Sequence, residues 1–156
     1  MADTIISQAA QGQLFELKIM LKFFPEEINF KISQPQKTSK WIKTVSQSEG
    51  YKIGDLNYIF CSDDYLLEMN KQYLEHDYYT DIITFDNSEE EGKLEGDIYV
   101  SIDRVKDNAE ALGIDFETEL RRVLIHGLLH LIGYEDSDDS LKTIMRAKED
   151  ECLLMF

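Results

Sequence analysis

The sequence predicts an α+β domain: a small mixed β-sheet with flanking helices. Short segments with strand-like alternation or β-branched residues alternate with helical segments over the first two-thirds of the chain, and helical patterns fill the last third. A length of 156 residues suits one domain, whose core buries roughly 70% of the surface of the unfolded chain. Neither an internal repeat nor a glycine- or serine-rich linker divides the sequence.

Nine elements are expected in chain order. Strands are predicted at residues 28–32, 54–61, 81–85 and 97–102, and helices at 35–49, 63–72, 103–112, 116–132 and a final segment through 141–152. The first two strands alternate apolar and polar residues, and the third is rich in β-branched and aromatic residues. The stretch 87–95 has no periodicity, so we expect it to be the open loop of a hairpin that joins the last two strands.

Residues typical of helix ends support the helices. Pro35 suits a first helical turn, and Gly50 ends that helix. Ser62 and Asp115 are expected N-caps, because a short oxygen-bearing side chain can accept a hydrogen bond from a free amide of the first turn. Gly133 is expected to end the longest helix in the left-handed conformation.

Composition indicates a globular protein of a reducing compartment. Hydrophobic residues make up 43% of the chain, and only two cysteines occur, Cys61 and Cys152. They are far apart and form no C-x-x-C pair, so neither a disulfide framework nor a cysteine zinc site is indicated. The N-terminus does not resemble a secretory signal, and no apolar stretch approaches the ~20 residues that span a bilayer. We therefore expect a cytoplasmic protein.

The net charge of −15 argues against a nucleic-acid partner, because phosphates would be repelled at long range. The charge is unevenly distributed, however. Residues 1–60 hold 7 basic and 6 acidic side chains, whereas residues 61–156 hold 9 basic and 25 acidic ones. If RNA binds, it should therefore contact the N-terminal part.

The apolar stretch 123–134 carries two of the three histidines, His126 and His130. Four residues turn a helix by about 400°, so the two imidazoles lie on one face, one turn apart. Leucines and isoleucines surround them, which predicts a buried helix. Either histidine alone would be typical of a satisfied core residue, but the pair favours a shared divalent cation, with zinc as the default.

A carboxylate is available to complete the site. Gly133 lets the chain turn back after the helix, so that Glu135 or Asp136 can reach the ion. Two histidines and one carboxylate leave a fourth position for water, which is the open arrangement of a catalytic zinc site. In the H-E-x-x-H helix of zinc peptidases, the residue after the first histidine is the general base, but here it is Gly127.

Three motifs in this chain resemble a known family. The histidine segment His126-Gly-Leu-Leu-His130-Leu-Ile-Gly133-Tyr-Glu-Asp136 resembles the H-G-x-x-H-x-x-G-Y-D-H signature of the YbeY family. Residues 73–85 resemble the family segment Y-R-x-x-D-x-x-T-N-V-L-S-F, and residues 96–98 resemble its G-D-I strand. The resemblance implies a zincin-like fold, with the histidine helix packed under the sheet, and the activity of a metal-dependent endoribonuclease in ribosomal RNA maturation.

The resemblance also implies site residues. Its three ligand positions fall on His126, His130 and Asp136, where Asp136 replaces a family histidine. The family's arginine falls on Leu74, so His76, two residues on, is our hypothesis for the missing cation or proton donor. A role for Asp97 in orienting a ligand or lining the cleft completes the catalytic candidates, although an aspartate at the start of a strand is often structural.

The expected function follows from these positions. Residues 20–156 are predicted to form a single metal-dependent hydrolase domain, because residues 20–25 resemble the start of the family's domain; residues 1–19 would be an appended or misassigned start. The domain would use one Zn²⁺ per chain to cleave single-stranded RNA. The implied partners are ribosomal RNA and, in addition, ribosomal proteins or a ribosome-associated GTPase. The sequence does not determine the oligomeric state.

A basic stripe is the candidate RNA-binding surface. Lys37, Lys40 and Lys43 recur at every third position of the helix predicted at 35–49. Such a stripe is also typical of a solvated helix face, and both interpretations stay open. The three lysines form the only compact basic patch in an acidic sequence.

Two other functions fit parts of the sequence. A metallohydrolase of peptides or small molecules would share the fold, but Gly127 stands where its base is needed. A non-enzymatic ribosome-assembly factor with a structural metal would use the acidic surface to bind basic proteins. Cleavage assays with peptide and RNA substrates distinguish the first alternative from an endoribonuclease. An assembly factor would keep its function in cells after the chemistry of the metal-bound water is lost, whereas an enzyme would not.

Overall fold

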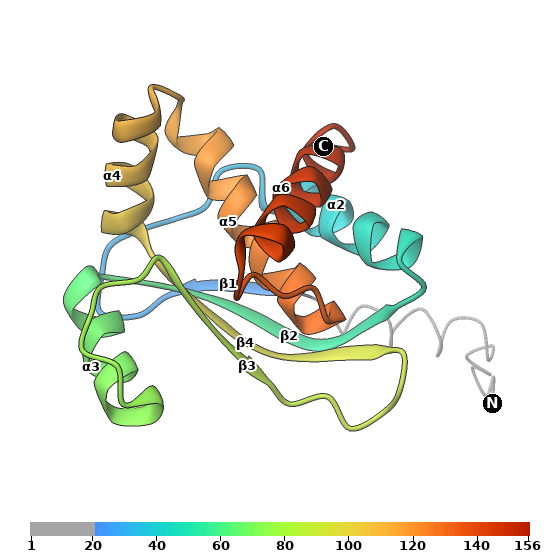
Figure 1. Cartoon of the computed structure of the whole chain (residues 1–156), viewed down its shortest axis with the longest axis horizontal. Coiled ribbons are helices and arrows are strands. Elements are labelled where there is room, and N and C mark those ends of the chain that lie inside the picture. Colours follow the sequence, from blue (N-terminus) through green and yellow to red (C-terminus); the bar gives the residue numbers. More distant parts are fainter. Residues whose placement is uncertain (1–20) are drawn as a thin grey trace, which may run out of the picture.

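The computed structural model describes residues 21–156, which form a four-stranded sheet with helices on both faces (Figure 1). The predicted extension, residues 1–19, lies outside the described residues. The strands are β1 (Lys22–Pro25), β2 (Lys52–Cys61), β3 (Ile82–Asp86) and β4 (Lys93–Ser101), and the helices are α2 (Pro35–Ser48), α3 (Asp63–Leu74), α4 (Ile102–Leu112), α5 (Phe116–Ile132) and α6 (Asp139–Leu153). The predicted α+β class is confirmed.

The sheet is mixed, as predicted. Its strand order is β1-β2-β4-β3, with β1 and β4 parallel to β2 on either side of it. Strand β3 lies at the edge and pairs antiparallel with β4, which confirms the predicted hairpin. Because β2 and β4 run parallel, helix α3 and strand β3 have to connect them across the sheet.

The strand predicted at 28–32 is wrong. The first strand is β1, where Phe23 stacks on Tyr58 of β2 with ring centroids 5.5 Å apart. Residues 28–32 form no strand, yet Ile32 is buried and the Phe30 ring packs edge-on against Phe60 at 4.9 Å. The alternation therefore reflects side chains of an irregular segment inserting into the core, a pattern that cannot be told from a strand by period alone.

The strand predicted at 97–102 is displaced. Strand β4 begins at Lys93, because the loop is shorter than expected and Glu95 already accepts a hydrogen bond from the Asn87 amide at 2.9 Å. At the other end, the Ser101 hydroxyl accepts from the Arg104 amide and caps α4, so Ile102 belongs to that helix. The predicted caps are confirmed: Ser62 accepts from the Tyr65 amide and Asp115 from the Thr118 amide.

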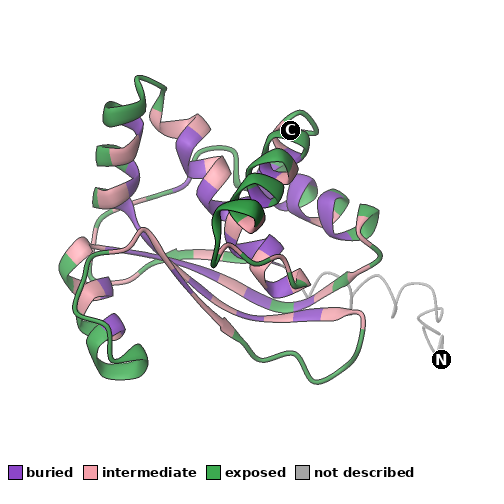
Figure 2. Cartoon of the chain, viewed as in Figure 1, coloured by how far each residue is buried: buried purple, intermediate pink, exposed green. Residues whose placement is uncertain are grey.

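The two faces of the sheet have different partners. Helix α5 packs on the face that carries the main core, and Figure 2 shows its buried side turned toward the strands. The Tyr58 hydroxyl of β2 donates to the Leu124 carbonyl of α5 at 2.9 Å inside this core. Helix α3 covers part of the opposite face through Leu66, which packs with Cys61 and Ile83.

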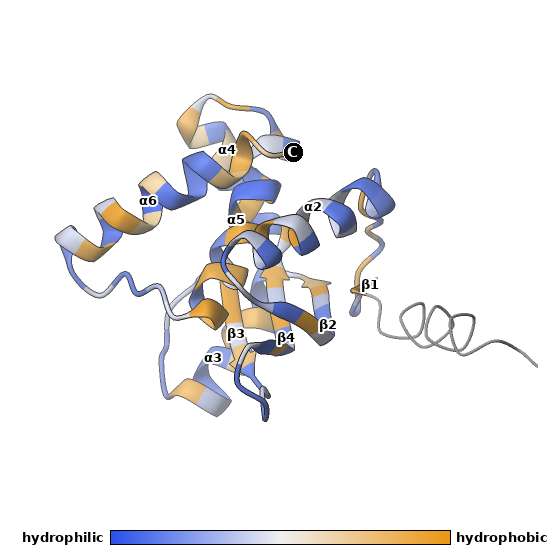
Figure 3. Ribbon diagram, turned by 90° about the vertical axis from the view of Figure 1, so that its right-hand side faces the viewer, coloured by the Kyte–Doolittle hydropathy of each residue, from blue (hydrophilic) through white to orange (hydrophobic). Residues whose placement is uncertain are grey.

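Hydrophobic residues lie along the strands and the adjoining part of α5 (Figure 3). Helix α6 carries polar residues between its apolar ones. Within residues 21–156, every helix is too short or too polar to traverse a bilayer.

Helix α5 lies close against the sheet at Gly127. A Cβ atom at this position would lie 2.7 Å from Cδ1 of Ile82 and 2.9 Å from Cγ2 of Ile98. Both distances are shorter than real carbon contacts, so a side chain here would force the two isoleucines or the helix to shift. Packing against the sheet therefore favours the glycine that weakens the peptidase hypothesis.

We predict that Gly127→Ala destabilises the protein, although alanine is the better helix former. The gain in helix propensity is about 1 kcal/mol, whereas overpacking a core costs about 1–3 kcal/mol. The free energy of unfolding, measured by urea denaturation, should fall by about 1 kcal/mol. The double variant Gly127→Ala/Ile82→Val removes the nearest methyl group, so its loss should be smaller than the sum of the two single losses. Equal or higher stability of Gly127→Ala would contradict this packing account.

Candidate metal centre

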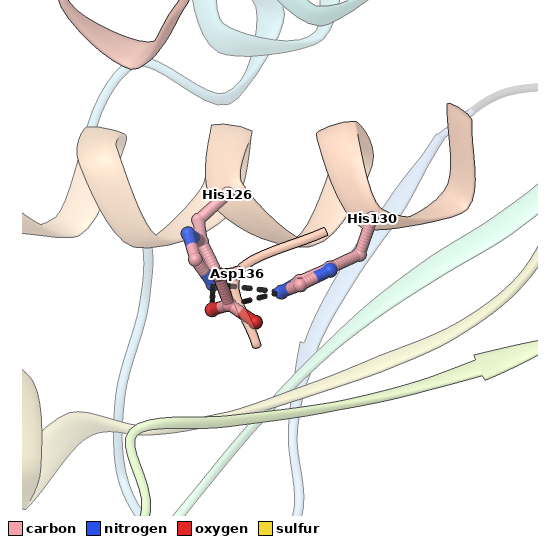
Figure 4. Close-up of side chains that lie close together, drawn as sticks. All are labelled: His126, His130 and Asp136. Carbon is pink, nitrogen blue, oxygen red and sulfur yellow. Dashed lines mark hydrogen bonds and ion pairs between the residues drawn. The ribbon is translucent and has the colours of Figure 1, made fainter. Parts of the chain in front are cut away.

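His126 and His130 direct their Nε2 atoms at the same point. The two residues lie one turn apart near the C-terminal end of α5, and their Nε2 atoms are 2.9 Å apart (Figure 4). The spacing of four residues thus has the predicted result. Neither side chain is fully enclosed, so the point between them is accessible from the surface.

The other nitrogen of each ring is already engaged. Nδ1 of His126 lies 2.8 Å from Oε2 of Glu149, and Nδ1 of His130 lies 3.0 Å from the Tyr134 carbonyl oxygen. Carboxylate and carbonyl oxygens only accept hydrogen bonds, so each Nδ1 has to carry the proton. In the neutral rings both Nε2 atoms then present lone pairs to each other, which is the tautomer that binds metals.

Asp136 completes the group. Gly133 ends α5 with φ 117°, and the Gly133 and Tyr134 amides donate back to the Leu129 carbonyl, which turns the chain toward the histidines. One oxygen of Asp136, Oδ2, lies 3.3 Å from Nε2 of His126 and 3.5 Å from Nε2 of His130. Of the alternative donors, Glu135 is exposed, and Asp138 caps α6.

These three atoms fit a metal ion. Zinc bonds of ~2.0–2.2 Å at tetrahedral angles place donor atoms roughly 3.3 Å apart. The observed separations of 2.9, 3.3 and 3.5 Å bracket that value. With both rings neutral, the lone pairs of the two Nε2 atoms and the Asp136 carboxylate converge, and no proton donor lies between the rings. A bound cation would relieve the repulsion between these electron-rich atoms. His126, His130 and Asp136 can therefore hold a metal ion, with the remaining coordination position open.

Glu149 is the functional residue that sequence reasoning missed. Its residue surface is 4% exposed, and it contacts His126 through one oxygen and the guanidinium of Arg122 through the other, at 3.2 Å. A signal was present in the sequence. Met145, Glu149 and Cys152 repeat at helical spacing on the buried face of α6, where a lone carboxylate needs a partner.

Carboxylates determine the electrostatics around His126. Burial lowers the pKa of this imidazole, but the hydrogen bond and charge of Glu149, together with the charges of Asp136 and Asp81, outweigh burial and raise the pKa above 6.5. Burial also raises the pKa of the Asp81 and Glu119 carboxyls nearby. The surroundings therefore favour a positive charge at the point where the ring nitrogens meet.

Two open clefts flank the centre. A cleft of about 400 Å³ has His130 in one wall and residues of the α3–β3 connection, His76 among them, in the other. A second, of about 270 Å³, has His126 and Asp136 in its wall and α6 opposite. The ion position thus lies between two surfaces that a substrate can occupy.

The structure places His76, but not Asp97, in the wall of a cleft beside the centre. His76 lines the cleft beside His130, and its Nδ1 lies 3.0 Å from the Tyr78 hydroxyl. Asp97 accepts a hydrogen bond from the side-chain amide of Asn57 at 2.9 Å, and Ile98, its neighbour in β4, packs in the α5 core. Because strand neighbours face opposite sides, Asp97 points away from the histidines, and its predicted catalytic role has no support from its position. Its contact is structural.

The lysine stripe lies apart from the centre on α2. Lys37 and Lys40 are exposed and Lys43 is half-buried, with Lys37 Nζ 4.2 Å from the centroid of the Phe156 ring. None of the three forms an ion pair with a residue that the structure describes. The spacing predicted from the sequence is present. Leu74, at the arginine position of the family motif, lines the cleft beside His130.

Fold and site define a class: an α+β protein whose longest helix presents two histidines, with an aspartate after it, to one metal position. Comparison with known proteins gives the particular family. The family model described as Endoribonuclease YbeY matches residues 24–156. The chain belongs to the YbeY family of endoribonucleases.

Individual relatives agree with the family match. The Endoribonuclease YbeY of Cytophaga hutchinsonii is 56% identical over 131 residues, which cover 84% of this chain and 92% of the relative. That of Flavobacterium psychrophilum is 49% identical and covers 85% of this chain and 94% of the relative. The solution structure of TM1509 from Thermotoga maritima superposes with a TM-score of 0.59 at 31% identity, covering 87% of this chain and 88% of that one.

We predict that Glu149→Gln weakens metal binding while Glu151→Gln does not. Loss of the carboxylate lowers the basicity of the His126 ring and loosens its orientation, and such outer contacts are worth about 10–100-fold in affinity. Glu151 is an exposed carboxylate on the same helix and serves as the control. Zinc affinity measured by competition with a chromogenic chelator checks the prediction, and equal affinity of the Glu149→Gln and native proteins would refute the role of Glu149.

Proposed function

We propose that this protein is a zinc-dependent endoribonuclease that cleaves single-stranded RNA during the maturation of ribosomal RNA in the cytoplasm. Hydrolysis of RNA phosphodiester bonds follows from its membership of the YbeY family. Zinc, the single-stranded substrate, the ribosomal target and the compartment are the proposal. Both free cysteines are buried, and burial raises the pKa of Cys152 to about 11, which suits thiols that stay reduced.

One observation carries the metal part: two imidazole Nε2 atoms and a carboxylate oxygen converge, with both Nδ1 atoms bound to acceptors. Nitrogen ligands favour zinc among the abundant divalent ions, and the carboxylate admits harder cations such as Mn²⁺. We propose one ion per chain, held by His126, His130 and Asp136. Bound there, the ion supplies Lewis-acid chemistry to the phosphodiester.

The chain's own residues orient the reaction. Glu149 and the Tyr134 carbonyl keep both Nδ1 atoms protonated and thereby aim the rings. We propose that His76, across the cleft from the metal position, supplies a proton or positive charge to the leaving oxygen. Its Nδ1 is paired with the Tyr78 hydroxyl, and its Nε2 has no hydrogen-bond partner in the part of the chain that the structure describes.

The alternative functions have less support. A peptidase of the H-E-x-x-H type needs a glutamate where Gly127 packs against the sheet without room for a side chain. An assembly factor with a structural metal would bring a fourth protein ligand to close the site, whereas the group found among the described residues has three members. Ribosomal proteins or a ribosome-associated GTPase remain proposed partners that bind in addition to RNA.

We predict one zinc ion per chain in protein purified without chelator. His126→Ala and His130→Ala should each abolish stoichiometric binding, since two protein ligands hold zinc weakly. Elemental analysis and the shift of the thermal midpoint on adding a chelator provide the two measurements. Protein that carries no metal and whose unfolding ignores the chelator would contradict the proposed centre.

Asp136 is tested against its neighbour. Asp136→Ala should lower zinc affinity by an amount comparable to losing a histidine, and Asp136→His should restore binding. Glu135→Ala is the matched control, because it removes an exposed carboxylate from the same turn. Cleavage of a labelled single-stranded RNA should fall together with zinc content across the series. An active Asp136→Ala protein that keeps its zinc would show that another residue is the third ligand.

The lysine stripe carries a separate prediction. Neutralising Lys37, Lys40 and Lys43 together to glutamine should weaken binding of ribosomal RNA fragments and reduce the salt slope by roughly 2, at about 0.7 per single-strand phosphate contact. Binding measured by filter retention between low and moderate salt gives the slope. An unchanged affinity and slope would identify the stripe as a solvated helix face.

A further inference from the structure

Positive charge is distributed unequally around the metal position. The cleft beside His126 is lined by three cationic side chains, those of Arg122, Lys142 and Arg146. The cleft beside His130 has no lysine or arginine among its described lining residues. A substrate with phosphates on both sides of the metal would therefore meet fixed positive charge on the α6 side.

Arg122 is fully engaged in structure. Its guanidinium contacts Glu149 at 3.2 Å and Asp150 at 2.8 Å, and its side chain is only 14% exposed. These two carboxylates neutralise its charge, and the first of them supports His126. Arg122 therefore positions the metal site from behind and offers little to a ligand in the cleft.

Lys142 and Arg146 are the more exposed cations of this cleft. They lie one turn apart on α6 and line the same cleft as His126 and Asp136. The Arg146 side chain is 54% exposed, and its ion pairing with Glu149 is long, at 3.9 Å. Lys142 is exposed and has no ion pair with any residue that the structure describes. Two exposed cations, one without an ion pair among the described residues and one with a single long pair, thus line the wall opposite His126 and Asp136.

We propose that Lys142 and Arg146 form a phosphate subsite, which binds the RNA phosphate adjacent to the one that is cleaved. This inference rests on the proposed endoribonuclease function. A helix places residues four apart on one face, so the two side chains can follow consecutive positions of a backbone that enters the cleft. Guanidinium and ammonium groups are the side chains that neutralise phosphates in single-strand binding, and contacts of this kind position the strand without selecting its bases.

An alternative role for the two cations is to neutralise the charges of Asp81 and Glu119, which line the same cleft. The contacts disfavour this alternative, because neither carboxylate lies within ion-pair distance of Lys142 or Arg146. The Asp81 carboxylate instead accepts a hydrogen bond from the side-chain amide of Asn108 at 3.3 Å. Lys142 and Arg146 are therefore the exposed cationic side chains of this cleft.

The test compares charge-neutralised variants of the full, zinc-loaded chain on a labelled single-stranded oligoribonucleotide. Lys142→Gln/Arg146→Gln should lower kcat/KM at least tenfold at low salt, mainly through KM, and reduce the salt slope by roughly 1.4, from two contacts of about 0.7 each. Lys142→Gln alone should have about half the effect on the slope, and Lys142→Arg should retain activity. Lys106 is an exposed lysine on α4, outside the cleft. Lys106→Gln removes one positive charge, as Lys142→Gln does, and should change neither kcat/KM nor the salt slope.

Metal content is measured for each variant by elemental analysis, and it separates the outcomes. A native protein that holds zinc but leaves the oligonucleotide intact would overturn the proposed function. A native protein that cleaves, with a double variant equal to it in activity and slope, would overturn the phosphate subsite alone. The subsite would also be wrong if Lys106→Gln lost as much activity, or if the activity lost in the double variant followed a loss of zinc.

Discussion

The contact of α5 with the sheet at Gly127 is the constraint on which the rest of the site depends. With no Cβ in the way, the helix lies directly against Ile82 and Ile98, and its depth determines how far the neighbouring His126 and His130 project. A wider gap would move both imidazoles relative to α6, which packs on α5 and supplies Glu149. Packing in the core thus controls donor geometry at the surface, since close-packed interiors transmit small displacements.

Charges at the centre are arranged in layers. The convergent nitrogen and oxygen atoms form the inner layer, Glu149 lies behind His126, and Arg122 lies behind Glu149. Each layer compensates the charge of the one before it, and the buried Glu149 carboxylate has a partner on each of its two oxygens. Folding thus brings the three metal-binding atoms of His126, His130 and Asp136 together at one position.

The acidic character of the chain is compatible with an RNA substrate when charge is considered locally. A net charge of −15 repels phosphates at a distance, but salt screens this field beyond roughly 10 Å. Within the cleft beside His126, the exposed Lys142 and Arg146 offer positive charge at short range. RNA binding by this acidic protein should therefore depend more on short-range contacts than on long-range electrostatic steering.

The sequence by itself determined the elements with strong local signals: the helix that carries His126 and His130, its stop at Gly133, the caps at Ser62 and Asp115, and the β3–β4 hairpin. These depend on neighbours along the chain, so periodicity and capping chemistry reveal them. Only the tertiary structure decided that residues 28–32 form no strand, that Asp97 faces away from the two histidines, and that Glu149 lies behind His126. Those outcomes depend on strand order and on helix packing between residues distant in sequence, which no local pattern encodes.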